Sequence, residues 1–383
     1  MSPEDLEALL RSLPPESTAA VSRQAVAKTS VAVDDLALSL IMLEGRQAGR
    51  RIKVSERPKT VGRDHHVDVV LADSDVSRLH CLLSVVDGSV IVEDLGSMNG
   101  TFIDDQRIDR RAPVPIGALL RIGEHVFRCE QCRRRDVDRA EEQHRDLDRA
   151  ANYVLSLLPR PIATGPVRTE WIFLPSARLG GDAFGYEALD AHAFAIYLID
   201  VCGHGVSAAM HSVSVLNVLR QHALPATDFK DPVQVLSALN VMFQMDRHDD
   251  QYFTMWYGVY DTRERTLTHA SAGHHPGYLV PEERSDAQPL KTPGVMMGAM
   301  LDARFHAERT RVPAGSSLYL FSDGVFEVLT AERQWHLSDF VPYLLQPVTR
   351  GTSECRRLHQ AVKAVCRSDS LEDDFSLLVV TFP

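Results

Sequence analysis

The hydrophobic pattern of this chain changes twice, and each change restricts the fold. From Leu38 to about Arg128, short apolar runs such as CLLSVVDG and SVIVEDLG alternate with turn residues. Many short strands at this spacing are typical of an all-β sandwich. From about Val167 onward, strand-like runs such as FAIYLIDV alternate in blocks with helical segments such as VSAAMHSVSVLNVLRQHAL. This second pattern predicts an α+β sandwich rather than a doubly wound sheet.

A helical pattern separates the two regions. Between Cys132 and Leu158, a mostly apolar seam recurs at alternating spacings of three and four, at Val137, Ala140, His144, Leu147, Ala151, Val154 and Leu158; Ala and His at its core positions weaken it as a dimer seam. Such a seam predicts one helix, which Pro159 and Pro161 would end. Two interpretations stay open. The seam packs against the chain's own domains, or it joins two copies in a homodimer through residues 132–158.

These patterns divide the chain of 383 residues into parts of the usual domain size. We expect a flexible tail, rich in Ser, Thr, Ala and Pro, over residues 1–36. The following parts are an all-β domain over 37–130, a helical linker over 131–160 and an α+β domain over 161–383.

Composition excludes several classes of protein. The formal net charge of −11 argues against a nucleic-acid partner, because phosphate backbones attract clustered Lys and Arg. No apolar run approaches the ~20 residues that span a bilayer. The start of the sequence, MSPEDLEALLRSLPPES, lacks a basic-then-apolar signal pattern. We therefore expect a cytoplasmic protein with no membrane partner.

The six cysteines offer no obvious metal or disulfide framework. Cys129 and Cys132 form a CxxC pair, but no second pair lies near them in the sequence. A structural zinc site needs four ligands. Free thiols in a reducing compartment are therefore expected.

The first candidate site lies at three turns of the N-terminal sandwich. These turns carry Gly62-Arg63, then the sequence SRLH from Ser77, then LGSMNGT from Leu95. A phosphorylated residue needs a guanidinium, a hydroxyl or backbone donor, and an amide that fixes its peptide chain. Loops on a rigid sandwich can present all three together, and an Arg fork fits a phosphate better than Lys does.

In this order, the motifs GR, SRxH and LGSxNGT resemble the forkhead-associated (FHA) domain. The resemblance implies that Arg63 and Ser77 bind the phosphate of a phosphothreonine protein, that Arg78 assists, and that Asn99 holds the peptide backbone; Gly62 and His80 would brace the loops. Met98 stands where the family usually carries Thr or Ser. This departure predicts reduced affinity or selectivity, and the alternative is an FHA fold that binds no phosphopeptide.

The second candidate site consists of aspartates at the ends of apolar strands in the C-terminal region. They occur in LGGD, LIDVCGHG, LFSDG and LEDDFSLLVV, as Asp182, Asp200, Asp323, Asp373 and Asp374. One such Asp beside a Gly is usually a turn residue, but a set of them in one domain indicates a site. Oxygen ligands favour hard ions such as Mg²⁺ or Mn²⁺ over zinc. Two such ions can hold a phosphate and activate a water.

The motifs LLPRP, LGGD, IDVCGHGVSAAM, YFTMWYGVYD, ASAGHHP, SDGVFE and DDFSLLVV are together similar to the metal-dependent protein phosphatases (PPM family), in particular the SpoIIE-like bacterial branch. The resemblance implies an αββα sandwich and two Mn²⁺ or Mg²⁺ ions. Asp200 would bridge both ions and the Val201 carbonyl would bind one of them. Asp323 and Asp373 would complete the other site, with Asp182 acting nearby through water.

Three further residues have candidate roles that do not rest on a clear family position. His204 is a candidate general acid for the leaving serine oxygen, with a structural role in its turn as the alternative. Arg178 could steer the substrate phosphate. Asp374 is expected beside the ligands rather than among them.

The predicted function is a metal-dependent serine/threonine phosphoprotein phosphatase of bacterial signalling. Its FHA domain would recruit or sense phosphothreonine proteins. The substrate would be a phosphorylated protein, in this branch often an anti-sigma-factor antagonist. The alternative is a non-catalytic phosphothreonine-binding scaffold, which the complete acidic set disfavours. A nucleotide enzyme is disfavoured because no phosphate-binding P-loop is present.

Overall fold

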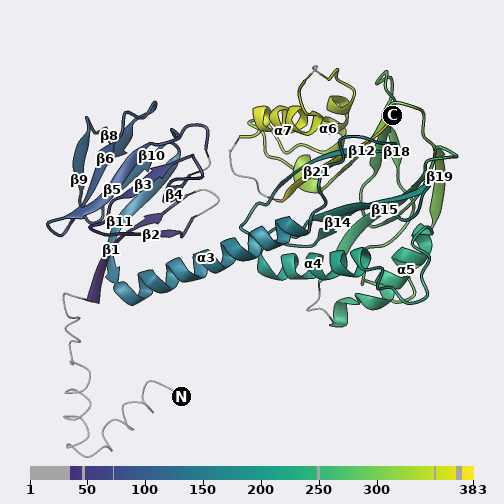
Figure 1. Cartoon of the computed structure of the whole chain (residues 1–383), viewed down its shortest axis with the longest axis horizontal. Coiled ribbons are helices and arrows are strands. Elements are labelled where there is room, and N and C mark those ends of the chain that lie inside the picture. The colour runs from purple at the N-terminus through teal and green to yellow at the C-terminus, as the bar shows by residue number, and fades with distance from the viewer. Residues whose placement is uncertain (1–34, 45–47, 72, 248–250, 349–350, 368–372) are drawn as a thin grey trace, which may run out of the picture. The chain divides into compact units, whose positions relative to one another are not determined.

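The computed structural model describes residues 35–44, 48–71, 73–247, 251–348, 351–367 and 373–383 (Figure 1). The chain divides into two compact units. The first comprises Met1–Leu43 with Arg50–Glu141, and the second comprises Glu44–Gly49 with Glu142–Pro383. The tail predicted over residues 1–36 lies outside the described residues as far as residue 34.

The first unit is a sandwich of two β-sheets, as the alternating pattern predicts. One sheet has the order β2-β1-β11-β10-β7-β8 and the other β4-β3-β5-β6-β9. The first sheet contains β1 (Leu36–Met42), β2 (Arg51–Val54), β7 (Thr101–Ile103), β8 (Gln106–Arg107), β10 (Leu119–Ile122) and β11 (His125–Arg133). The second contains β3 (Lys59–Gly62), β4 (Val69–Val70), β5 (Cys81–Val86), β6 (Ser89–Asp94) and β9 (Arg111–Val114).

The hairpin between β5 and β6 shows how the sequence specifies this sandwich. Cys81 and Leu83 are buried in the core, whereas the alternate residue Leu82 is half-buried. Asp87 and Gly88 connect the strands with φ values of 50° and 76°. Positive φ at both central residues is what a type I′ turn requires, and Asp-Gly supplies it readily.

Helix α3 (Arg134–Leu157) follows β11 directly. It begins at Arg134 rather than at the predicted Cys132, because β11 pairs with β1 as far as Arg133. Within the first unit, the Glu141 carboxylate accepts a 3.0 Å hydrogen bond from the Lys53 backbone N–H and pairs with Lys59 at 3.2 Å. The helix ends just before Pro159 and Pro161, as predicted.

The two ends of the apolar seam of α3 are buried within the chain itself. Val137 is fully buried, and Val154 and Leu158 are 8% and 7% exposed. Val154 packs with Leu179 and Ala209 of the second unit. This burial favours the interpretation that the seam packs against the chain's own domains.

The homodimer stays a prediction. If it forms, Leu147→Asp should lower the mass measured in solution by light scattering, and a monomeric wild type would contradict it.

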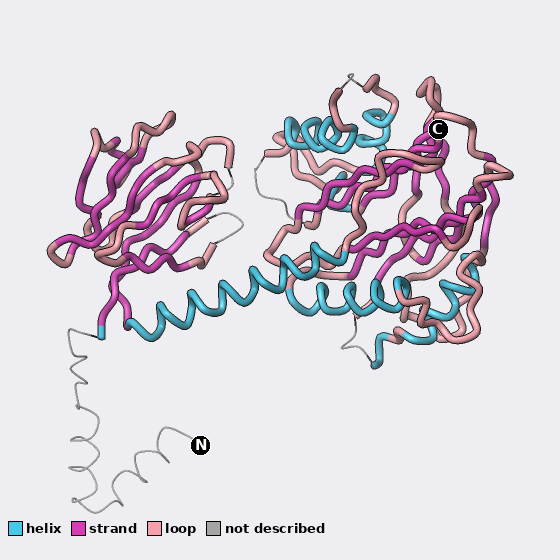
Figure 2. The backbone as a smooth tube through the Cα atoms, in the orientation of Figure 1, coloured by secondary structure: helices cyan, strands magenta, loops and turns pink. Residues whose placement is uncertain are grey.

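The second unit contains two stacked sheets with helices on their outer faces (Figures 1 and 2). One sheet has the order β13-β14-β15-β16-β19 and the other β12-β21-β20-β17-β18. The first is formed by β13 (Ala183–Ala188), β14 (Ala193–Val201), β15 (Phe253–Asp261), β16 (Thr266–Ala272) and β19 (Ala307–Arg311). The second is formed by β12 (Arg168–Leu174), β17 (Gly277–Val280), β18 (Gln288–Leu290), β20 (Ser316–Phe321) and β21 (Phe375–Phe382).

Helices α4 (Val206–Arg220) and α5 (Pro232–Met242) cover the first of these sheets, and α6 (Leu337–Leu344) and α7 (Glu354–Val365) cover the second. Strand β14 is therefore buried on both faces. Its residues Ile196 and Leu198 pack between the sheets, whereas Tyr197 and Ile199 pack under α4 and α5. This burial explains why β14 reads as a continuous apolar run that ends on Asp200. Among the described residues, no helix combines the length and apolar character needed to cross a membrane.

We expect one buried histidine to make the second unit sensitive to acid. His269 in β16 is fully buried and stacks on Trp256 with ring centroids 5.5 Å apart. Neither of its ring nitrogens has a hydrogen-bond partner. Burial lowers the pKa of His269 to about 4. In the unfolded chain His269 has its ordinary pKa of about 6.5, so below that pH the unfolded state binds a proton that the folded state does not. The stability that neutral His269 contributes is therefore complete above about pH 6.5 and is lost as the pH falls toward 4.

We expect this one group to lower the free energy of unfolding by about 2 kcal/mol between pH 7.5 and pH 5. Urea titrations of wild type and His269→Phe at both pH values would measure it. His269→Phe should lose this part of the pH dependence of the unfolding free energy. Replacing the exposed His306 with Phe should leave that pH dependence unchanged. An equal pH dependence in His269→Phe and wild type would contradict the prediction.

Candidate functional sites

The strand-end aspartates of the second unit meet at one end of the two sheets. Asp200 is the penultimate residue of β14, Asp323 follows β20, and Asp373 immediately precedes Asp374 and β21. A Cβ added to Gly324 would lie 2.3 Å from the Asp374 carbonyl oxygen, so the turn after Asp323 packs directly on the backbone of residues 373–374. Glycine at 324 therefore permits the approach that brings Asp323 beside Asp373.

Asp182 reaches the same region from the loop before β13. A Cβ added to Gly181 would lie 2.9 Å from the Val201 carbonyl oxygen. The loop thus approaches the end of β14 so closely that only glycine fits next to that carbonyl. Asp182 is 3% exposed, and its Oδ2 has no hydrogen-bond partner.

The carboxylates of this cluster strongly perturb one another. Burial, followed by the charges of Asp323 and Asp373, raises the pKa of Asp200 well above its ordinary value. Burial, followed by the charges of Asp200 and Asp374, does the same to the pKa of Asp182. Burial raises the pKa of Asp323 to about 6, with further contributions from Asp373 and Glu327. Like charges in a buried site disfavour ionisation, so the cluster needs positive charge to be fully ionised.

Glu327 belongs to this cluster, although the sequence interpretation gave it no role. Its charge contributes to the raised pKa of Asp200, Asp323 and Asp373. It lies four residues after Asp323, and its backbone N–H donates to the Asp323 carbonyl at 2.7 Å. The acidic end of the motif SDGVFE was the signal that could have identified it.

Asp374 holds the loop that carries Asp182. Its Oδ1 accepts hydrogen bonds from the N–H and hydroxyl of Ser176 at 2.7 and 3.0 Å, and its Oδ2 accepts from the Gly181 N–H at 2.6 Å. Ser322 supports the same strand, because its hydroxyl donates to the Asp374 carbonyl at 2.9 Å. With both oxygens engaged, Asp374 braces the loop of Asp182; its place beside the ligands rather than among them stays a prediction.

His204 lies in the exposed turn between β14 and α4. Burial raises the pKa of Asp373, and the charge of His204 acts in the opposite direction. The structure therefore places His204 within electrostatic range of the acidic cluster. Its neighbours Gly203 and Gly205 have φ values of 86° and 87°, which only glycine adopts without strain.

Arg178, considered for steering the substrate phosphate, contacts α3. Its guanidinium contacts Asp148 and His144 of that helix, and the steering role stays a prediction. The adjacent Leu179 packs on Val154 of the same helix. Arg178 thus fastens the loop before Asp182 to α3, and the sequence carried no sign of this pairing across 30 residues.

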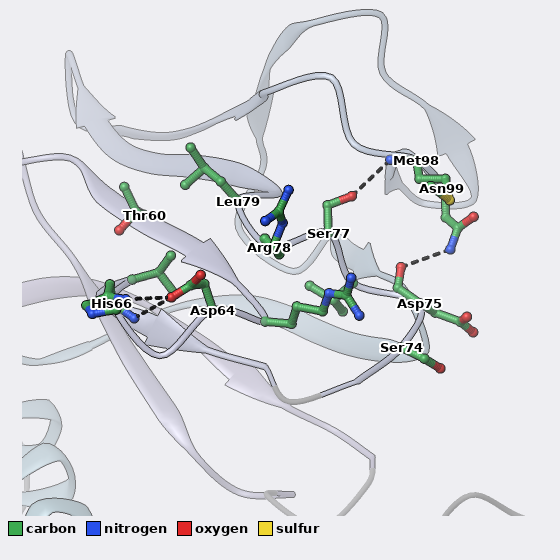
Figure 3. Close-up of a pocket in the computed structure, with 13 residues that line it drawn as sticks. Thr60, Asp64, His66, Ser74, Asp75, Ser77, Arg78, Leu79, Met98 and Asn99 are labelled. Atoms are coloured by element: carbon green, nitrogen blue, oxygen red, sulfur yellow. Dashed lines mark hydrogen bonds and ion pairs between the residues drawn. The ribbon is translucent and has the colours of Figure 1, made fainter. Parts of the chain in front are cut away.

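The three turns of the first unit line one pocket of about 760 Å³. Its wall includes Arg63, Ser77, Arg78 and Asn99, together with Met98, the residue at which this sequence departs from the FHA pattern (Figure 3). The structure therefore brings together every residue that the sequence assigned to phosphopeptide binding.

Gly62 and His80 hold the pocket loops in place. A Cβ on Gly62 would lie 2.2 Å from the Arg78 carbonyl oxygen, so glycine is required where β3 meets the second turn. His80 is buried, and its Nδ1 accepts a hydrogen bond from the Ser77 N–H at 3.2 Å. Its Nε2 donates to the Gly100 carbonyl at 3.2 Å. His80 therefore ties the second turn to the third.

The third turn is organised by Asp94, a residue at the start of this turn to which the sequence interpretation gave no role. Its Oδ1 accepts from the backbone N–H groups of Gly96 and Ser97, each at 2.9 Å. Its Oδ2 accepts from the hydroxyls of Ser97 and Thr101, each at 2.6 Å. An Asp directly before LGS is the local signal for such a turn, because Asp side chains readily bind the backbone two and three residues ahead.

Within the pocket, two of the candidate residues bridge the turns. The Ser77 hydroxyl accepts from the Met98 N–H at 3.0 Å. The Asn99 amide donates to the Asp75 carbonyl at 2.9 Å (Figure 3). The Met98 side chain is 87% exposed, so a thioether at the rim stands where the FHA pattern has a hydroxyl.

Comparisons with known proteins agree with this division of the chain. The family model for stage II sporulation protein E (SpoIIE) matches residues 190–383. The chain belongs to the SpoIIE family. A second family model, described as the cytoplasmic domain of an inner membrane component of T3SS, matches residues 41–132.

Individual relatives of this SpoIIE family member match one unit each. Phosphoserine phosphatase RsbP of Bacillus subtilis is 28% identical over 187 residues, which are 48% of this chain and 45% of RsbP. FHA domain-containing protein FhaB of Mycolicibacterium smegmatis is 41% identical over 92 residues, which are 24% of this chain and 59% of FhaB. The chain thus spans about half the length of the curated relatives it matches.

A solved structure supports the fold of the second unit. The SiaA-PP2C domain of Pseudomonas aeruginosa superimposes with a TM-score of 0.54 at 18% identity, covering 63% of this chain and 98% of that domain. Together with the sheet topology, these findings confirm the predicted fold class, an FHA sandwich and an αββα sandwich of the PPM type.

Proposed function

We propose that this chain is a metal-dependent serine/threonine phosphoprotein phosphatase whose FHA domain binds phosphothreonine proteins. The observation that carries the proposal is the cluster of mutually perturbed carboxylates at one end of the second unit. Membership of the SpoIIE family and similarity to a phosphoserine phosphatase support the same chemistry.

The cluster fits divalent ions of the Mg²⁺ or Mn²⁺ type. Its donors are oxygens, which such ions prefer, and the buried Oδ2 of Asp182 lacks a partner. Asp200 would be shared between two ions, with the Val201 carbonyl on one and Asp323 and Asp373 on the other. When bound, the ions would neutralise these carboxylates, polarise a phosphoryl oxygen and supply a nucleophilic water at neutral pH.

The chain's own groups would prepare the reaction. Asp374 fixes the loop of Asp182 through three hydrogen bonds, which keeps that carboxylate in position beside Asp200. His204 is exposed and its charge acts on Asp373; its imidazole would give a proton to the departing serine or threonine oxygen.

The FHA domain would supply the choice of partner. Arg63 and Ser77 would bind a phosphate, with Arg78 assisting and Asn99 holding the peptide. A phosphorylated regulatory protein, such as an anti-sigma-factor antagonist, is the proposed substrate of the second unit. The alternative of a non-catalytic scaffold would keep the FHA interaction and lack turnover.

Phosphatase assays on the full chain would test the proposal. We expect p-nitrophenyl phosphate and a phosphoserine peptide to be hydrolysed with Mn²⁺ or Mg²⁺, and we expect EDTA to stop turnover reversibly because the carboxylates alone provide no nucleophile. Calcium, which binds oxygens in looser geometry, serves as the control ion. Undiminished turnover in EDTA would exclude the metal mechanism, and no turnover with any ion would favour the scaffold.

A further inference from the structure

We infer that Asp64, His65 and His66 form a site for a divalent transition ion of the zinc class at the rim of the FHA pocket. Among the described residues, this is the group of three whose ligand atoms all lie within 4.8 Å of one another. The Asp64 Oδ1 is 2.8 Å from the His66 Nδ1 and 3.6 Å from the His65 Nδ1. Two imidazole nitrogens and a carboxylate oxygen thus lie close enough together to contact one ion.

The chemistry of the three donors selects the ion. Imidazole nitrogens with one carboxylate suit Zn²⁺, Ni²⁺ or Cu²⁺, whereas Mg²⁺ prefers oxygen alone. The side chains of His65 and His66 are 83% and 80% exposed, so an ion can reach them without displacing packed groups. The site is therefore chemically distinct from the oxygen-lined cluster of the second unit.

The backbone beneath the site is already fixed. The Asp64 N–H donates to the Arg78 carbonyl at 3.2 Å, and the Arg63 N–H donates to the Ser77 carbonyl at 3.0 Å. The His66 N–H donates to the Asp64 Oδ1 at 3.0 Å. The Asp64 carboxylate, held on a fixed loop, loses little freedom when an ion binds. Three protein ligands also leave coordination positions open for water or an anionic oxygen.

The position of this Asp-His-His site links it to the pocket. Asp64 and His66 line the same pocket as Arg63, Ser77 and Arg78 (Figure 3). Without an ion, the Asp64 carboxylate places negative charge on the wall that would receive a phosphate. A divalent ion reverses that charge, which favours an anionic ligand. The ion and a phosphothreonine peptide should therefore bind with positive and reciprocal coupling, a coupling that rests on the proposed phosphothreonine binding.

Zinc titration of the full chain tests the site itself. Calorimetry is done with Zn²⁺ in excess Mg²⁺, for wild type, for the His65→Ala/His66→Ala double variant and for His306→Ala as an exposed control. We expect the double variant to bind one equivalent of Zn²⁺ less than wild type and the control to bind as much as wild type. Equal zinc stoichiometry in the double variant and wild type overturns the site.

Peptide titration with and without Zn²⁺ tests the coupling. We expect Zn²⁺ to tighten a phosphothreonine peptide by about fivefold or more in wild type but not in the double variant. Zinc binding without any change in peptide affinity overturns the coupling. Arg63→Ala should lose the peptide and keep the zinc equivalent, so failure of the proposed phosphothreonine function is distinguished from failure of the ion site.

Discussion

Replacing Asp200 with Asn should lower phosphatase turnover at least about 100-fold, which corresponds to roughly 3 kcal/mol or more of lost transition-state stabilisation. The side chain has nearly the same size, so packing at the end of β14 is preserved. The amide cannot carry the negative charge through which Asp200 would hold both ions. Initial rates on p-nitrophenyl phosphate with saturating Mn²⁺, beside a urea titration, would separate lost chemistry from lost fold.

The stability of this variant gives an independent check. Asp200 lies in a cluster where burial and like charges raise its pKa, so removing its charge relieves repulsion in the ion-free protein. We therefore expect Asp200→Asn to be at least as stable as wild type in EDTA, with less added stability from Mn²⁺. The exposed Asp286 provides the matched control, since Asp286→Asn should keep full activity. Wild-type turnover by Asp200→Asn would remove Asp200 from the proposed site.

Motif order predicted which residues the structure brings together, because these residues lie in turns between recognisable strands. Gly62 and His80 illustrate this: both were expected to brace the FHA loops, and the close approach to Arg78 and the contacts to Ser77 and Gly100 confirm it. Local sequence was sufficient here, because each turn is short and its partners follow in order.

The same reasoning could not predict contacts between segments that are distant in the sequence. Asp374 and Gly181 are 193 positions apart. Nothing in either motif indicates that the Asp374 carboxylate binds the loop that carries Gly181. The seam of α3 likewise predicted an apolar face, but periodicity does not say which surface covers it. The packing of Val154 on Leu179 and Ala209 favours the chain's own domains for that part of the helix, and the homodimer stays a prediction.

Two helices escaped prediction for different reasons. Helix α6 contains Pro342, which usually argues against a helix interior. Helix α7 has a readable start, since the Ser353 hydroxyl accepts from the Arg356 N–H, and its buried residues Leu358 and Val362 are four positions apart. The signal in α7 was present, and the strongly charged sequence around it concealed the narrow apolar face.

Arg63 provides the sharpest test of the FHA pocket. A guanidinium that makes a charge-assisted hydrogen bond to phosphate contributes roughly 1.5–3 kcal/mol. Arg63→Ala should therefore weaken phosphothreonine peptide binding at least about tenfold. Arg63→Lys should recover only part of the loss, because an ammonium keeps the charge without the planar fork. Fluorescence anisotropy of labelled peptides on the full chain, with zinc excluded, would measure all three proteins.

The matched control is Arg121, which belongs to the same unit and stacks on Phe102 with its guanidinium carbon 3.9 Å from the ring centroid. Arg121→Ala removes the same charge outside the pocket, so peptide affinity should change little if the contact of Arg63 with phosphate is what matters. An unphosphorylated twin of each peptide separates phosphate recognition from general attraction. If both peptides bind equally, or neither binds, then Met98 marks a domain that kept the FHA fold and lost its phosphate site; binding gained in Met98→Thr would confirm that cause.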